Sequence, residues 1–152
     1  MPSQRRRPVK VAISSSQRAI RVPRKRIAEL IAFLARSVGA DLVEVDLAIV
    51  TGRQIAAINR RYLGHSGVTD VLSFDLSDDG GKRVSAQLVV CADLAVKEAR
   101  SRGHGPQQEL MLYVVHGLLH LLGYDDADPA SAARMSARSG QLLEAFYRRR
   151  RR

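Results

Sequence analysis

The chain has 152 residues and a formal net charge of +10 at pH 7, from 25 Lys and Arg against 15 Asp and Glu. This length fits one domain with its own hydrophobic core. The longest uncharged stretch, 110–124, is shorter than the roughly 20 residues that span a bilayer, and the basic N-terminus lacks the apolar segment of a secretory signal. We therefore expect no membrane association, and the single cysteine, Cys91, excludes an internal disulfide and fits a reducing cytoplasm.

Hydrophobic periodicity divides the chain into nine elements. Alternating apolar residues indicate strands, apolar residues three and four apart indicate helices, and Gly, Pro and capping residues separate them. In chain order we predict a strand at 9–13, a helix at 23–37, a strand at 42–50, a helix from 51 to about 63, strands at 71–76 and 84–91, and helices from 93 to about 102, from 106 to Gly123 and from 129 to about 147.

Local signals refine these elements. Thr51 and Gln54 form a capping box, Asp93 caps the helix that follows it, and the turn 77–81 pairs the strands on either side as a hairpin. The order of elements predicts an α/β (α+β) fold, a single domain with a mixed four-stranded sheet and about five helices.

The helix that begins at Pro106 carries His116 and His120, four residues apart, so both imidazoles project from one helix face. Gly123 ends this helix, and Asp125 and Asp126 follow at once. Two imidazoles and one carboxylate leave a fourth position open on a tetrahedral ion, which is typical of catalytic zinc. The carboxylate also suits Fe, Mn or Ni.

The two histidines also have a simpler interpretation, as partly buried residues that are satisfied by backbone carbonyls. The rest of the helix is apolar on every side, which predicts a buried helix, and two polar rings on such a helix need a shared partner. We therefore predict a metal site, with Asp125, Asp126 and Asp128 as rival third ligands. His65 and His104, in loops with glycines, are predicted to be surface residues.

Gly117 argues against one class of metalloenzyme. Metalloproteases of the His-Glu-x-x-His type carry their general base directly after the first histidine, where this chain has Gly117. Peptide hydrolysis by that mechanism therefore has no base. We expect the glycine to leave open space beside the metal, where a bulky substrate can approach.

The segment His116-Gly-Leu-Leu-His120-Leu-Leu-Gly-Tyr-Asp125 resembles the signature of the YbeY family. A second block, 58–64 followed by 69–74, resembles the family's Asn-x-x-Tyr-Arg-x-x-x-x-x-Thr-Asp-Val-Leu-Ser-Phe segment, and 87–91 is a third, weaker block. The resemblance covers most of residues 40–147. It implies a metal-dependent endoribonuclease of ribosomal RNA maturation, with the metal-binding helix packed centrally.

Three positions depart from the family pattern: Asp126 stands in place of a third histidine, Leu63 in place of an arginine, and Ala86-Gln87 in place of Gly-Asp. The register makes Asp126 the expected third ligand. Its carboxylate lowers the charge of the site to about +1, which weakens water activation without abolishing it. Arg60 shares a helix face with Leu63 and either replaces the missing phosphate contact or lies on a solvated basic face.

The positive charge lies at the two ends of the chain. Residues 1–26 hold nine Lys or Arg and no acidic residue, 148–152 are five arginines, and the residues between them carry a net charge of −4. Such ends bind polyanions, and we expect RNA, with no DNA; the alternative is a pair of disordered segments that bind any polyanion. We predict a disordered basic arm at 1–7, one domain at 8–147 and an Arg-rich tail at 148–152.

The sequence thus predicts a cytoplasmic, single-strand-specific endoribonuclease that acts on ribosomal RNA and the ribosomal subunit. His116, His120 and Arg60 are its predicted catalytic residues, and His116, His120 and Asp126 hold one zinc ion. The alternative is a ribosome- or RNA-binding assembly factor with a retained metal and little or no cleavage, which the departures at Leu63, Gln87 and Asp126 favour.

Overall fold

The structure, a computed structural model, describes residues 7–78, 83–124 and 127–150. These residues form four strands and five helices, so the predicted α+β class is confirmed. In chain order the elements are β1 (Lys10–Ser15), α1 (Arg24–Val38), β2 (Leu42–Val50), α2 (Gly52–Leu63), β3 (Val71–Asp75), β4 (Val84–Cys91), α3 (Ala92–Arg102), α4 (Pro106–Leu121) and α5 (Pro129–Arg150).

The strands form one mixed sheet in the order β1-β2-β4-β3. β1 and β4 both run parallel to β2, with Leu47 of β2 opposite Ile13 on one side and Leu88 on the other. β3 pairs antiparallel with β4, as the predicted hairpin requires. β3 is therefore an edge strand, which matters because all three blocks of the family resemblance have residues in it or beside it.

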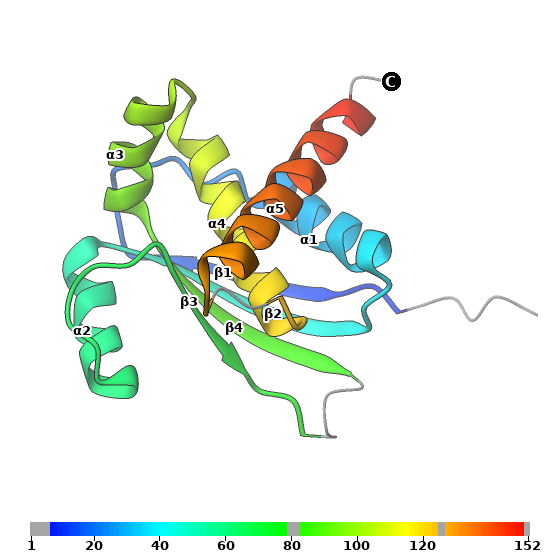
Figure 1. The fold of residues 1–152 in the computed structure, drawn as a ribbon, viewed down its shortest axis with the longest axis horizontal. Coiled ribbons are helices and arrows are strands. Elements are labelled where there is room, and N and C mark those ends of the chain that lie inside the picture. The colour runs from blue at the N-terminus through cyan, green and yellow to red at the C-terminus, as the bar shows by residue number, and fades with distance from the viewer. Residues whose placement is uncertain (1–6, 79–82, 125–126, 151–152) are drawn as a thin grey trace, which may run out of the picture.

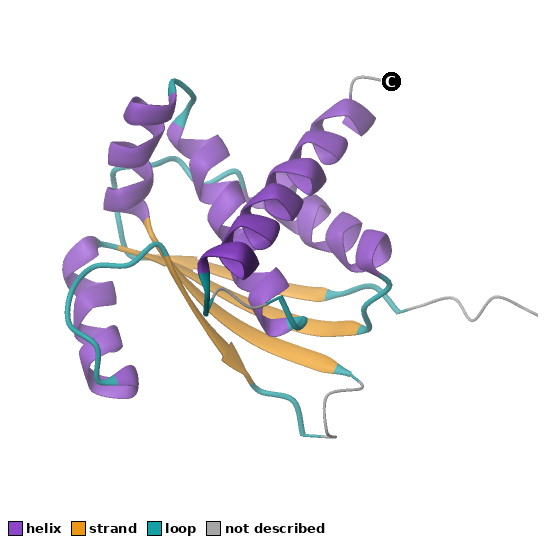
Figure 2. Ribbon diagram, in the orientation of Figure 1, coloured by secondary structure: helices purple, strands orange, loops and turns teal. Residues whose placement is uncertain are grey.

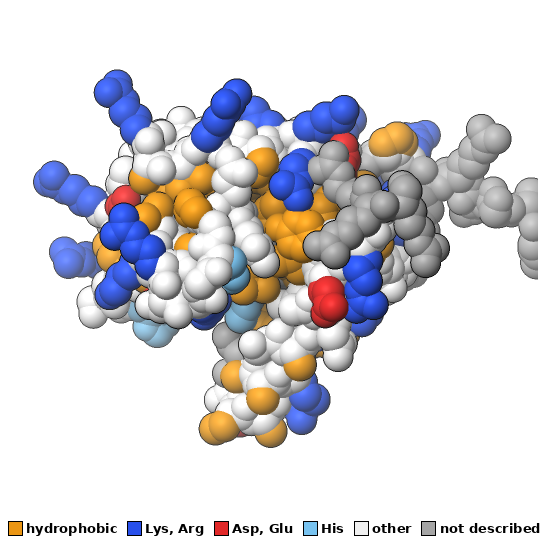
Figure 3. All heavy atoms as spheres, turned by 90° about the horizontal axis from the view of Figure 1, so that it is seen from above, with side chains coloured by type: hydrophobic (Ala, Val, Ile, Leu, Met, Phe, Trp, Pro, Cys, Tyr) orange, Lys and Arg blue, Asp and Glu red, His pale blue; other side chains and the backbone are white. Residues whose placement is uncertain are grey.

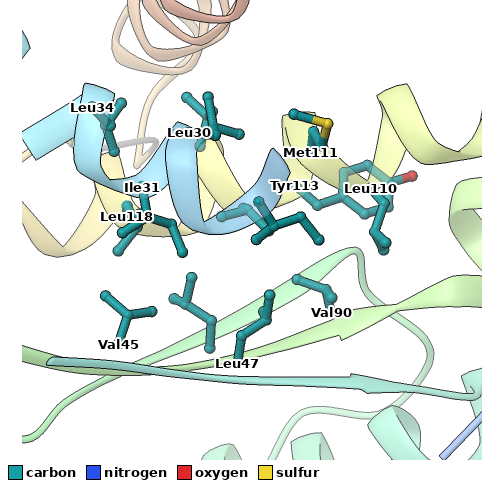
Figure 4. Close-up of a cluster of buried hydrophobic side chains, with 14 of the residues drawn as sticks. Leu30, Ile31, Leu34, Val45, Leu47, Val90, Leu110, Met111, Tyr113 and Leu118 are labelled. Atoms are coloured by element: carbon teal, nitrogen blue, oxygen red, sulfur yellow. The ribbon is translucent and has the colours of Figure 1, made fainter. Parts of the chain in front are cut away.

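The two faces of the sheet are covered unequally. Figures 1 and 2 show α1, α4 and α5 together over one face, whereas α2 lies alone under the other. Figure 4 shows the main core, where Ile31 of α1 and Leu118 of α4 point toward Val45 and Leu47 of β2. A smaller cluster under α2 contains Val50, Ile55, Leu72, Val89 and Cys91. The helix that carries the histidines is thus central, as the resemblance implied. No helix in the described ranges is both long and apolar enough to cross a membrane.

The N-terminal cap of α2 is the one predicted from the sequence, but the cap of α3 is not. Thr51 and Gln54 form the predicted capping box at the start of α2. At the start of α3 the cap is Cys91, whose Sγ accepts the Leu94 N–H at 3.4 Å. Asp93 was wrongly predicted as this cap, because its carboxylate accepts the Gly52 N–H at 2.6 Å and so serves the N-terminus of α2.

The last helix is longer than the sequence predicted. It was expected to end near Tyr147, whereas α5 continues to Arg150. Arg148 forms an ion pair of 2.9 Å with Glu144 one turn earlier, and the Arg149 guanidinium lies over the Phe33 ring of α1. The ion pair lies within α5, and the contact with Phe33 holds part of the predicted Arg-rich tail against α1. Residues 1–6 of the predicted arm and 151–152 of the tail lie outside the described residues.

Candidate functional site

The end of α4 forms a tight turn directly after the histidines. Pro106 occupies the first turn, where its missing N–H costs nothing, and the helix ends at Leu121. Gly123 then takes a φ of 104°, and its N–H donates to the His120 carbonyl at 3.3 Å. The Tyr124 N–H donates to the Leu119 carbonyl at 3.0 Å. The chain therefore turns back at the place predicted from Gly123.

The two histidines lie where this central helix leaves the core. His116 is half-buried and His120 is exposed, whereas the residues between them are buried. Because they stand four residues apart in a regular helix, their rings project from one face. The structure thus brings two imidazoles to one place at the surface, and their role as metal ligands stays a prediction.

The third ligand lies outside the described residues, because these exclude both Asp125 and Asp126. Within the described ranges, no three His, Cys, Asp or Glu side chains gather as a metal site would require. The third rival, Asp128, has another role. Its Oδ1 accepts the Ser131 N–H at 2.8 Å and its Oδ2 accepts the Ser131 hydroxyl at 3.0 Å, and these bonds lower the pKa of the carboxyl. Asp128 therefore caps α5, which leaves Asp125 and Asp126 as candidates.

Gly117 does not leave open space beside the metal, so that prediction was wrong. The glycine is buried, and its carbonyl accepts the Ser73 hydroxyl of β3 at 2.9 Å. A Cβ at this position would lie 2.8 Å from Val71 Cγ2 and 3.1 Å from Leu88 Cδ2. The glycine is needed because α4 crosses β3 and β4 at close range, and a glutamate base has no room here.

Arg60 lies on a different side of the sheet from the histidines. It is exposed in the last turn of α2, which packs on the face opposite α4. β3 lies between them: Val71 and Ser73 face Gly117 of α4, whereas Leu72 packs in the cluster under α2. Arg60 and the histidines thus lie on opposite sides of the edge strand β3, so a substrate that contacts both must cross this strand.

The departures Leu63 and Gln87 lie on or near a partly apolar hollow that the sequence analysis missed. The hollow has a volume of about 390 Å³ and is lined by Ile58, Tyr62, Phe74, Leu76, Gln87 and Val89. The Tyr62 ring is 61% exposed and meets Phe74 edge-on, with 6.3 Å between ring centres. Leu63 is also exposed. The signal in the sequence was the pair of apolar positions 74 and 76, which face outward from a strand that is covered on this side by one helix.

A buried ion-pair cluster at the other end of α4 was also missed. The Glu109 side chain is fully buried, and its carboxylate accepts Arg102 Nη1 at 2.7 Å. His104 Nε2 lies 2.6 Å from the second carboxylate oxygen. His104 is therefore half-buried and not the surface residue predicted, whereas His65 is exposed as expected. The signal was a glutamate in the first turn of an apolar helix, directly after a loop that contains His104 and follows Arg102, the last residue of α3.

Comparisons with known proteins point to one family. The family model described as Endoribonuclease YbeY matches residues 12–147. A protein of Macrococcus caseolyticus named Endoribonuclease YbeY is 37% identical over 134 residues, which cover 82% of this chain and 86% of that protein. One of the same name from Anaeromyxobacter sp. is 41% identical over 128 residues, which cover 84% of this chain and 65% of that protein.

One solved structure shows a similar fold. The solution structure of TM1509 from Thermotoga maritima aligns with a TM-score of 0.62 and 24% identity, over 93% of this chain and 91% of that one. Together with the family model and the curated relatives, the histidine-bearing helix and the mixed sheet lead to one assignment. The chain belongs to the YbeY family of endoribonucleases.

Proposed function

We propose that the chain cleaves single-stranded ribosomal RNA with one divalent ion, zinc before Fe, Mn or Ni, held by His116, His120 and Asp126. Membership of the YbeY family makes the chain an endoribonuclease, a hydrolase that acts on RNA, and does not favour the alternative of a non-catalytic factor. The observation that carries the metal proposal is the pair of imidazoles at the surface end of an otherwise buried helix. The role in ribosomal RNA maturation and the cytoplasmic location rest on the family likeness and on the single, buried cysteine.

The residues present fit such an ion. Imidazole nitrogens with one carboxylate are a ligand set of catalytic zinc sites and also of other first-row metals. A bound ion would supply positive charge to the phosphoryl oxygens and make a water molecule more acidic. The protein's own contribution is rigidity, since Leu118 and Leu119 are buried beside the histidines and Ser73 ties Gly117 to β3. Ligands on a packed helix keep their positions during the reaction.

Cleavage of a phosphodiester also needs a cation that stabilises the negative charge that develops in the transition state. Arg60 is exposed at the end of α2, so its guanidinium is accessible to an RNA strand that crosses β3. Arginine binds phosphate through two parallel N–H donors, which orients the strand as well as attracting it. We propose this contact for Arg60 in place of the arginine that the family carries at Leu63.

The proposal is tested by metal analysis of the purified protein together with cleavage of single-stranded RNA. We expect about one equivalent of divalent metal in the wild type, as for a single zinc site, together with RNA cleavage. His116→Ala should lose both, whereas His65→Ala, at an exposed loop histidine, should keep both. A His116→Ala variant that retains metal and cleavage would show that α4 does not carry the site.

The departures from the family supply a second test. Asp126→His restores the third imidazole, and Leu63→Arg restores a cation near the substrate. The first substitution acts on water activation and the second on transition-state charge. Each should therefore raise the rate of RNA cleavage, and the double variant should be faster than either single variant. If neither raises cleavage while the metal stays bound, these positions do not limit catalysis.

A further inference from the structure

The two basic ends of the sequence meet on one surface of the folded domain. Arg26, in the first turn of α1, lies with its guanidinium 5.3 Å from the ring centre of Tyr147 in the last turns of α5. Arg149 of α5 lies 5.8 Å from the ring centre of Phe33 in α1. The crossing of α1 and α5 therefore joins basic residues from opposite ends of the chain.

Two hollows flank the last turns of α5. The first, of about 840 Å³, lies between Arg26 of α1, Arg148 of α5 and the start of α4 at Gly105–Gln108. The second, of about 300 Å³, is lined by Arg36 of α1 and Arg149 of α5. We name these four arginines, Arg26, Arg36, Arg148 and Arg149, the α1–α5 basic face. Figure 3 shows Lys and Arg side chains standing out from the helical side of the molecule, around a more apolar centre.

The chemistry of this face suits phosphate. Guanidinium groups bind phosphate through forked N–H donors, and the N-terminus of α4, which has no side-chain cap, adds partial positive charge to the first hollow. Two carboxylates also line the hollows, Glu29 and Glu144, and Glu144 is paired with Arg148. Arg26 and Arg149 stack on aromatic rings, which fixes their direction and reduces the entropy lost on binding.

We propose that the α1–α5 basic face binds the phosphate backbone of the RNA substrate at a second site, remote from the histidines. This inference rests on the proposed RNA-cleaving function. Gln108 lines the first hollow, and His120 lies twelve residues further along α4, a separation of about 18 Å along the helix axis. The face then anchors a long RNA while the other end of α4 meets the bond to be cleaved.

The test is binding of a labelled single-stranded RNA of about 20 nucleotides to the full chain without metal, by fluorescence anisotropy over a range of salt. Arg148→Gln with Arg149→Gln removes two cations from the face, and Arg148→Lys with Arg149→Lys keeps the charge. The matched control is Lys97→Gln with Arg100→Gln, which removes two exposed cations from α3, on the other side of α4. Circular dichroism confirms that each variant is folded.

Two lost phosphate contacts should weaken binding about tenfold near 0.15 M salt and reduce the slope of log K against log salt by about 1.4. The lysine variant should recover most of the affinity, and the α3 control should bind within about twofold of wild type, since a surface charge alone acts weakly at a distance. Equal weakening by the α3 control, or wild-type binding by the glutamine variant, would overturn the inference.

This experiment separates the two proposals. If the wild type cleaves no RNA while the binding pattern holds, the proposed function fails and the second site stands. If His116→Ala loses cleavage while the glutamine variant binds RNA as the wild type does, the second site fails and the proposed function stands.

Discussion

The two ends of α4 use polar residues in opposite ways. At the N-terminal end Glu109 is fully buried, and both carboxylate oxygens have partners from the same chain, Arg102 and His104. At the C-terminal end His116 is half-buried and His120 is exposed, next to a turn that redirects the chain. Removing one partner of such a buried charge destabilises the fold, whereas polar side chains at the surface end of a rigid helix can contact an outside ligand.

The largest effect is expected at the surface end. His120→Ala should reduce RNA cleavage by at least about 100-fold, since removal of even an outer partner of a metal ligand costs 10- to 100-fold. Its free energy of unfolding should change by less than about 0.5 kcal/mol, because the side chain is exposed. Cleavage assays and urea denaturation of the metal-free protein measure the two quantities. A large loss of stability with unchanged cleavage would reverse the roles of the two ends.

Arg102→Ala tests the buried end. It leaves the Glu109 carboxylate buried with His104 alone, and we expect a loss of about 3 kcal/mol in the free energy of unfolding. Arg100→Ala is the matched control on the same helix, because Arg100 is exposed, and should change stability by no more than about 0.5 kcal/mol. Urea denaturation compares them, and equal stabilities of the two variants would mean that the ion pair contributes nothing.

Gly117→Ala should lower the free energy of unfolding by about 1 to 3 kcal/mol, because its Cβ would overlap Val71 of β3 and force a shift of packed atoms. Gly140→Ala in α5 is the control: nothing lies within 4 Å of the new Cβ, and alanine should stabilise the helix by up to about 1 kcal/mol. Thermal unfolding separates the two, and the idea fails if both substitutions shift the midpoint in the same direction.

The sequence predicted those features that are set by neighbours along the chain. The strands at 42–50 and 84–91 and the capping box at Thr51 were placed correctly, because alternation and capping are local properties. The histidine pair was visible for the same reason, since four residues make about one helical turn. The predicted ligand Asp126 lies outside the described residues, and its role stays a prediction.

The features that were missed or wrong depend on contacts between distant residues. The role of Gly117 is set by Ser73, and that of Asp93 by Gly52, neither of which is near in sequence. The helical end of α5 depends partly on Phe33 in α1. The role of Arg60 stays a prediction: its helix face was read from the sequence, whereas its distance from the histidines depends on the position of β3 at the sheet edge. Local patterns carry no information on such packing.

The smallest effect concerns alkaline pH and Tyr113, which lies in the buried half of α4. Burial raises the pKa of its phenol, and the Glu109 carboxylate raises the pKa further. The folded chain therefore holds this proton above pH 10, where the unfolded chain releases it. This contribution to stability is present below pH 10 and is lost as the pH rises further, by at most about 1.4 kcal/mol per pH unit for one group.

Tyr113→Phe should flatten the decline in the unfolding free energy between pH 10 and 11 without removing it, because burial also raises the pKa of Tyr147 and Cys91. An equal decline in the wild type and in Tyr113→Phe would show that Tyr113 is not its source.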